Sequence, residues 1–172
     1  MSRNTKTVLI TTAVLVFAVA VLAWLNRDSV AERKVIQESG TFQITTDSSQ
    51  HIVTIDDLAE IGFRVIDANY KTNLMPAVQK KYNGVSLKSL LSHLGVDYST
   101  AKRVSFSAAD GYISAAPISD AIDEDNCFIV FGEDGNPLGT RESGGFGPYM
   151  VIFARDRFSQ RWCKYLLEIA VK

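Results

Sequence analysis

Two cysteines have the strongest potential for redox or metal chemistry in this sequence. Cys127 and Cys163 are its only cysteines, and a thiolate is the group that soft metals and disulfide exchange require. They do not form a C-x-x-C pair, and with two histidines their spacing does not suggest a zinc ribbon. In an exported domain they can form a disulfide worth ~2–4 kcal/mol. Cys127 lies in an apolar run, which equally suits an inert buried thiol, so both alternatives stay open.

A glycine-rich loop offers backbone groups rather than side chains. It reads Gly144-Gly145-Phe146-Gly147-Pro148, and successive backbone N–H groups in such a loop can bind a phosphate. Pro148 has no N–H, and a strand follows, whereas dinucleotide binding requires a helix N-terminus. The alternative is a turn in which glycine supplies a positive φ. The segment Asp110-Gly111-Tyr112 likewise suits either a pocket wall or a tight turn with a packed tyrosine.

A basic cluster lies near the C-terminus. Its members are Arg155, Arg157, Arg161 and Lys164. The cluster can bind an anionic ligand or lipid headgroups. The alternative is a solvated loop, in which the nearby Asp156 offsets part of the positive charge. Over the whole chain, 18 basic and 19 acidic side chains give a net charge of -1, so no basic field exists that would hold nucleic acid. We find no Ser-His-Asp or Cys-His arrangement.

The N-terminal region contains a segment suited to a membrane. Residues 8–25 carry no charge, and only Thr11 and Thr12 among them are polar. As a helix they span roughly 27 Å, close to the ~30 Å of a bilayer core, with Trp24 at the interfacial end. The alternative is a cleaved signal peptide with a site at Ala18-Val19-Ala20. The apolar length favours an anchor, and either interpretation predicts an exported domain.

The chain length of 172 residues suits one ordinary folded domain. We expect a short tail at 1–7, the anchor at 8–25, a polar juxtamembrane linker at 26–40 and the domain at 41–172. A capping pattern predicts a helix from Thr54, and four leucines on one face predict another between Ser86 and Gly95. A short helix is expected near 118–122, whereas 69–81 shows no clear period. Predicted strands cover 41–46, 51–55, 63–68, 103–108, 127–132, 149–153 and 165–171. Hairpins mixed with occasional helices indicate an α+β fold.

Taken in order, several segments resemble the molybdopterin-binding oxidoreductase domain. This is the catalytic domain of sulfite oxidases and assimilatory nitrate reductases, and its bacterial members include exported methionine-sulfoxide reductases. The segments that carry the resemblance are Thr54-Ile55-Asp56-Asp57-Leu58, Tyr82-Asn83-Gly84-Val85-Ser86-Leu87, Ala109-Asp110-Gly111-Tyr112, Asp134-Gly135-Asn136-Pro137-Leu138, Gly144-Gly145-Phe146-Gly147-Pro148-Tyr149 and Trp162-Cys163-Lys164. The resemblance covers roughly residues 41–172 and implies a mixed-sheet fold of the sulfite-oxidase type.

The resemblance also implies a molybdopterin site, from which the chain departs. In the family a cysteine thiolate binds molybdenum, in a segment like C-x-G-N-x-R. The equivalent residues 65–73 contain no cysteine, and Met150 stands where the family's arginine would lie. Asp67, Asn69 and Tyr70 in that stretch offer no soft ligand. The resemblance places the cofactor-binding residues at Asp110, Tyr112, Gly144, Gly145 and Lys164, and it identifies no metal ligand.

The sequence therefore predicts an oxidoreductase-like domain that residues 8–25 anchor on the extracytoplasmic side, at the cell membrane or in the periplasm, with a secreted form if the N-terminus is cleaved. Its molybdenum site is altered or lost, so classical enzyme activity is not expected. Molybdopterin is the implied cofactor, and a redox or membrane protein is the expected partner, with no nucleic acid. The alternative is a non-catalytic module on the same fold that binds a ligand or a protein.

Overall fold

The computed structural model describes residues 8–25, 40–72 and 76–172 of the chain. Contacts divide the chain into two units, Met1–Val35 and Ile36–Lys172. The first unit contains the helix Val8–Leu25, whose mean hydropathy is 2.7. Its length and composition are sufficient to cross a membrane, a test that a signal sequence also passes. The tail predicted at 1–7 and residues 26–39 of the predicted linker lie outside the described residues.

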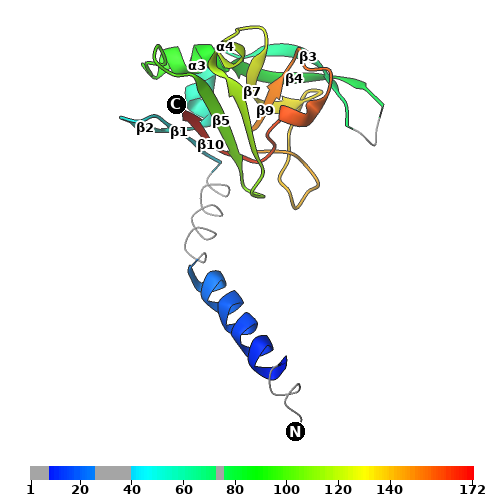
Figure 1. Ribbon diagram of the computed structural model, residues 1–172. Coiled ribbons are helices and arrows are strands. Elements are labelled where there is room, and N and C mark those ends of the chain that lie inside the picture. Colours follow the sequence, from blue (N-terminus) through cyan, green and yellow to red (C-terminus); the bar gives the residue numbers. More distant parts are fainter. Residues whose placement is uncertain (1–7, 26–39, 73–75) are drawn as a thin grey trace. The chain divides into compact units, whose positions relative to one another are not determined.

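The second unit contains a mixed sheet in which the two ends of the domain meet (Figure 1). Its strands lie in the order β2-β1-β10-β5-β6. β10 runs parallel to β1 and antiparallel to β5, so the last strand of the chain lies in the middle of the sheet. The bounds are β1 Phe42–Thr45, β2 Gln50–Val53, β5 Arg103–Ala108, β6 Ile113–Pro117 and β10 Leu166–Val171.

A second sheet of five strands is antiparallel throughout. Its strands lie in the order β3-β4-β7-β8, and β9 also pairs with β7. The bounds are β3 Arg64–Tyr70, β4 Val78–Ser86, β7 Cys127–Glu133, β8 Asn136–Pro137 and β9 Met150–Phe153. Together the two sheets confirm the predicted α+β fold with a mixed sheet.

The helices begin where their capping residues predict. In α2 (Ile55–Ile61), the Thr54 hydroxyl accepts the Asp57 N–H, and Asp57 Oδ2 accepts the Thr54 N–H at 2.7 Å. That backbone hydrogen bond is the main reason why the pKa of Asp57 is lowered. In α3 (Leu87–His93), the Ser86 hydroxyl accepts the Ser89 N–H, and the predicted leucine face is buried. A short α4 (Ile118–Ala121) and a 3-10 turn (Ser159–Arg161) complete the helices of the described residues.

One apolar core lies between the sheets. Phe106 of the first sheet packs edge-on against Phe153 of the second, with ring centroids 5.8 Å apart. Tyr149 joins the same core by an edge contact with Phe42 at 5.0 Å. All of these side chains are buried, so the strands and loops that carry the resemblance are fixed by a common interior.

Gly84 allows β4 to approach β7 closely. The register of the two strands shifts between Asn83 and Gly84, as at a β-bulge. A Cβ atom at Gly84 would lie 2.3 Å from the carbonyl oxygen of Ile129 and 2.9 Å from the Cα of Val130. Because both are backbone atoms, no rotamer change can make room.

Replacement of Gly84 by alanine should therefore destabilise the domain. We expect Gly84→Ala to lower the free energy of unfolding by about 1–3 kcal/mol, the usual cost of overpacking. Urea denaturation followed by the fluorescence of the buried Trp162 measures it. The control is Lys81→Ala on the same strand, an exposed side chain whose loss should change stability by less than about 0.5 kcal/mol. Equal stability of the two variants would contradict the close approach.

Candidate functional site

Three motif segments meet at Tyr165, just before β10. The Tyr165 N–H donates to the Phe146 carbonyl at 2.9 Å, and the Tyr165 carbonyl accepts the Ala109 N–H at 2.9 Å. These bonds join the 144–148 loop, the 109–112 turn and the 162–165 segment, although they are far apart in sequence. Tyr165 has a φ of 53°, a left-handed conformation that this junction requires. The segments that sequence analysis selected are thus brought together.

Lys164 lies between aromatic rings beside this junction. Its ammonium donates to the Tyr70 hydroxyl at 2.9 Å and lies 3.7 Å from the centroid of the Phe146 ring. Tyr70 in turn lies 5.8 Å from the Trp162 ring. Such a site stabilises a half-buried cation by cation–π attraction. Tyr70 ends β3, within the stretch where the resemblance expects a cysteine, and its contact with Lys164 was not predicted.

A second charged group lies across β4 and β7. Lys80 forms an ion pair with Glu133 Oε1 and lies 5.7 Å from the Tyr70 ring. The other oxygen, Glu133 Oε2, and the Tyr82 hydroxyl are both buried without a hydrogen-bond partner among the described residues. Burial, followed by the Glu133 carboxylate, raises the pKa of the Tyr82 phenol. Sequence analysis missed this group because Tyr82 lies 51 residues and Lys80 lies 53 residues before Glu133 in the chain.

An open pocket of about 420 Å³ lies over this group and the glycine loop. That volume is in the range of small-molecule sites. The ion pair of Lys80 and Glu133 lines it together with Asp134, so the pocket wall is not a cationic field. Its lining residues are Lys80, Glu133, Asp134, Asn136, Pro137, Leu138, Gly144, Gly145 and Phe146.

The amide groups of the glycine loop are used inside the protein. The N–H groups of Gly144 and Gly145 donate to the carbonyls of Arg141 and Thr140, and those of Phe146 and Gly147 donate to Leu138 and Gly139. Gly144 has a φ of 77°, and a Cβ at Gly145 would lie 2.1 Å from the Leu138 carbonyl oxygen. Both features suit the tight-turn interpretation, in which the loop contributes surface to the pocket rather than free N–H donors.

The predicted residues Asp110 and Tyr112 form the turn between β5 and β6. Asp110 Oδ1 accepts the Tyr112 N–H at 3.0 Å, and Gly111 has a φ of 87°. The Tyr112 hydroxyl donates to the Gln160 carbonyl. Neither residue lines the pocket above the glycine loop, and neither does Lys164, which contacts Phe146 of its wall, so of the five predicted residues only Gly144 and Gly145 line that pocket.

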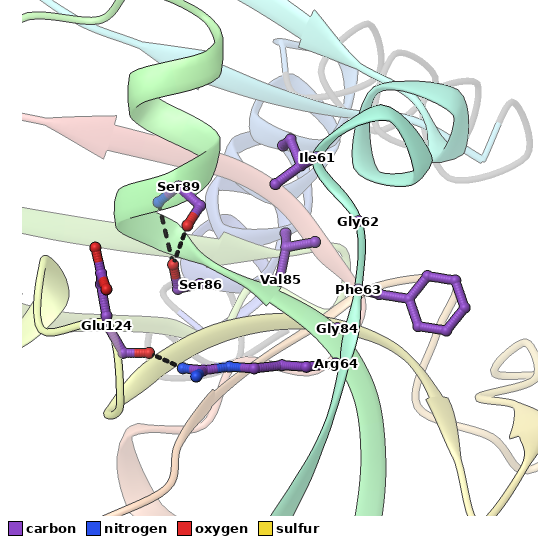
Figure 2. A pocket seen from close by; sticks show the side chains of 9 residues that line it. All are labelled: Ile61, Gly62, Phe63, Arg64, Gly84, Val85, Ser86, Ser89 and Glu124. Atoms are coloured by element: carbon purple, nitrogen blue, oxygen red, sulfur yellow. Dashed lines mark hydrogen bonds between the residues drawn. The ribbon is translucent and has the colours of Figure 1, made fainter.

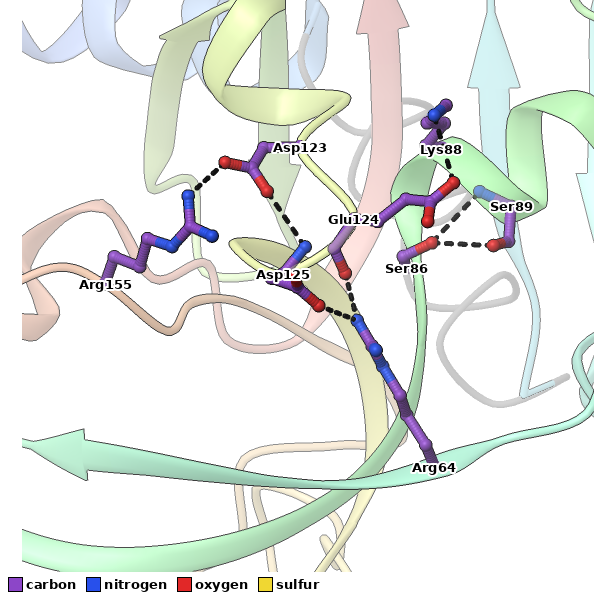
Figure 3. Close-up of polar contacts among 8 residues, drawn as sticks. All are labelled: Arg64, Ser86, Lys88, Ser89, Asp123, Glu124, Asp125 and Arg155. Carbon is purple, nitrogen blue, oxygen red and sulfur yellow. Dashed lines mark hydrogen bonds and ion pairs between the residues drawn. The ribbon is translucent and has the colours of Figure 1, made fainter.

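The remaining arginines of the basic cluster are largely paired with carboxylates. Arg161 contacts Asp156 at 2.6 Å and Asp120 at 3.0 Å, and Arg155 contacts Asp123 (Figure 3). Figure 3 also shows Arg64 bound to Asp125. This arrangement suits the solvated-loop interpretation more than an open anion site.

Arg64 also forms one wall of a small pocket beside the start of α3 (Figure 2). The Ser86 and Ser89 hydroxyls face it, and the Arg64 guanidinium lies 4.7 Å from the Phe128 ring centroid. The pocket volume is about 190 Å³, which is below that of ordinary ligand sites. Arg64 therefore joins β3 to the 123–126 loop rather than offering its charge to a ligand.

Residues 48–172 match the oxidoreductase molybdopterin binding domain family. The chain belongs to this family. The crystal structure of the sulfane dehydrogenase SoxCD from Paracoccus pantotrophus is similar, with a TM-score of 0.64 and 15% identity over 78% of this chain and 38% of that chain. That similarity shows the fold, and the sequence-predicted family is confirmed. No curated protein matches the chain.

The residues of this family member do not suit a thiolate-bound molybdenum. Cys127 and Cys163 are free thiols with no exposed surface. Cys127 begins β7, and Cys163 lies opposite Val151 of β9. Burial raises the pKa of both thiols, that of Cys163 to about 12, so neither is a ready thiolate. Among the described residues, no group of three or more His, Cys, Asp or Glu side chains could hold a metal ion.

The burial of the thiols predicts their reactivity. In the folded protein at pH 8, a disulfide-exchange reagent should label neither cysteine rapidly, because the thiols are inaccessible and protonated. In denaturant without reductant, the same reagent should titrate two thiols per chain. A count of zero thiols would instead establish the Cys127–Cys163 disulfide that the sequence left open.

The raised pKa of Cys163 also predicts how stability depends on pH. The unfolded chain loses its thiol proton above about pH 8.5, whereas the folded chain keeps it up to about pH 12. The thiol contribution to stability is therefore complete below pH 8.5 and falls as pH rises. Urea denaturation at pH 7 to 10 should show a decrease in stability that is smaller in Cys163→Ser. Identical slopes would contradict this contribution.

Proposed function

We propose that this chain is a membrane-anchored, extracytoplasmic member of the family that has lost the molybdenum centre and serves as a binding module. The observation that carries the proposal is the position of the thiols. The family's molybdenum ligand is a cysteine thiolate, which must be accessible to the metal, whereas both cysteines of this chain are buried and their thiol pKa values are raised. The domain is thus oxidoreductase-like in fold without the ligand on which the family's metal chemistry depends.

The contact between Tyr70 and Lys164 supports this proposal. The stretch equivalent to the family's ligand segment supplies Tyr70 here, and its hydroxyl accepts a hydrogen bond from Lys164. A phenol that is hydrogen-bonded to an ammonium differs from a thiolate as a ligand, because its donor atom is an oxygen rather than a soft sulfur. We infer that this pair closes the region that the cofactor centre would require.

The location is part of the same proposal. The 18-residue helix Val8–Leu25 is apolar enough to span a bilayer, and its length supports a retained anchor rather than a short signal-peptide core. With the domain outside the cytoplasm, the expected partner is another protein at the membrane surface. A cleaved N-terminus would release the same domain.

A second function, binding of a molybdopterin without its metal, is favoured by one observation. The Lys164 ammonium has no carboxylate partner among the described residues, so an anionic group such as a pterin phosphate can supply its counter-charge. Gly144 and Gly145, which line the pocket, and Lys164, which contacts Phe146 of its wall, would then border the pterin, whereas Asp110 and Tyr112 lie outside the pocket lining. A metal-free pterin would bind but would not carry oxygen-atom transfer.

Cofactor content tests both functions. We would purify the full chain from its native membrane, measure molybdenum and tungsten by elemental analysis, and measure oxidised pterin by fluorescence. The proposal predicts neither metal at a stoichiometric level. Pterin without metal, lost in Lys164→Met but retained in Arg157→Met, would establish the second function. Stoichiometric metal would overturn the proposed loss of the centre.

A further inference from the structure

An apolar groove of about 670 Å³ shares Asn136, Pro137 and Leu138 with the pocket above the glycine loop. The buried side chains of Leu138 and Tyr149 and the half-buried ring of Phe131 form its interior. Ile55, at the start of α2, stands at its mouth and is 45% exposed. The other lining residues are Gly40, Asn83, Gly132, Gly135, Asn136, Pro137, Gly139, Thr140 and Pro148.

The apolar surface continues beyond the groove. Phe63 packs edge-on against Phe131, with ring centroids 5.4 Å apart, yet 57% of Phe63 is exposed. Val65, which pairs with Asn83 of the groove wall, is 58% exposed. Contiguous exposed apolar side chains mark binding sites, whereas apolar side chains scattered singly over a surface do not. Covering this face with an apolar ligand is therefore more favourable than leaving it exposed to water.

The chain between the groove and the predicted anchor is short. Tyr149, in the groove interior, donates from its hydroxyl to the Gly40 carbonyl at 2.9 Å, so Gly40 is fixed at the groove edge. The helix Val8–Leu25 ends 15 residues earlier. Fully extended, that length of chain reaches at most roughly 50 Å. If the anchor is retained, the groove cannot move beyond this distance from the bilayer, which keeps membrane lipid at a high effective concentration.

We propose that this groove binds one acyl chain of a membrane phospholipid. The interior contacts the apolar chain, and the carboxamides of Asn83 and Asn136 at the wall offer donors to the ester carbonyls near the headgroup; Asn136 has a second N–H for this purpose besides the one donated to the Asp134 carbonyl. The inference rests on the anchor of the proposed function, since the anchor supplies the lipid, but it does not depend on any metal or pterin. Binding would hold the domain against the membrane surface.

Lipid cross-linking in a nanodisc tests this site on the full chain. Nanodiscs of phosphatidylcholine would contain a phosphatidylcholine with a diazirine in its acyl chain, and mass spectrometry would locate the adducts after illumination. The expected result is adducts on residues 131–140 and on Tyr149, in addition to those on residues 8–25. Adducts confined to residues 8–25 would overturn the proposal.

Two matched variants separate the groove from general surface contact. Ile55→Glu places a carboxylate at the groove mouth, and a glutamate at the first position of α2 is favourable for the helix, so folding is kept. It should reduce the groove adducts at least fivefold. Ile113→Glu, on β6 of the other sheet, changes a side chain that is 66% exposed and should leave the adducts unchanged. Equal adducts in Ile55→Glu and the unchanged chain would contradict the site.

Two further readouts on the same sample distinguish the other outcomes. The intact mass of the chain reports whether residues 1–25 are retained, so failure of the anchor is seen independently of failure of the groove. The mass of the particle reports one or two chains per nanodisc. A dimer that Ile55→Glu dissociates, with no groove adducts, would assign the groove to a second copy of the chain and overturn lipid binding.

Discussion

The central position of β10 in the first sheet is the constraint on which the domain depends. β10 is the last strand of the chain, yet it pairs with β1 on one side and with β5 on the other. Neither neighbour can complete its hydrogen bonds until the C-terminus is in place. The junction at Tyr165 then joins the turn before β6 and the glycine loop to the entry of this strand. Closure of the sheet and assembly of the candidate site are thus one event.

The same closure explains why the cysteines are inert. Cys163 directly precedes the junction and faces Val151 of β9, while Cys127 begins β7 opposite Phe153. Both side chains are buried in the interior between the sheets. A thiolate there would be cut off from water, and no cation would fully compensate its charge. Burial therefore raises both thiol pKa values. Moving either thiol to a surface site would require opening the core that holds β7 and β9 together.

Much of the fold could be predicted from sequence, because its signals are local. The Thr54 cap and the leucine face after Ser86 depend on residues within one or two turns, and both helices form there. β4 was missed as a strand, because its polar residues Lys80 and Lys81 hide the alternation. β6 was missed because its inward residues, Ser114 and Ala116, are small and give a weak apolar signal. Local patterns cannot show strands that are defined mainly by their partners.

The candidate site was harder to predict, since its contacts join distant parts of the chain. Lys164 was selected from the resemblance, but Tyr70, which binds it from 94 residues away, was considered only as a metal ligand. The Lys80–Glu133 pair joins neighbouring strands and leaves no motif, and the motif that contains Tyr82 does not show that its hydroxyl is buried without a hydrogen-bond partner among the described residues. A sequence shows which side chains could do chemistry, whereas pairing of strands decides which of them meet.

The glycines of the family-like motifs explain how the resemblance can be strong although residues 65–73 contain no cysteine. Gly84 lets β4 approach the backbone of β7, and Gly145 lets its loop approach Leu138, where a Cβ would lie within 2.3 Å and 2.1 Å of a carbonyl oxygen. The N–H groups of residues 144–147 donate hydrogen bonds to carbonyls within the protein. These residues are required by packing whatever the pocket holds. Motifs of this kind therefore report the fold faithfully, and chemistry must be argued from the side chains that face the pockets.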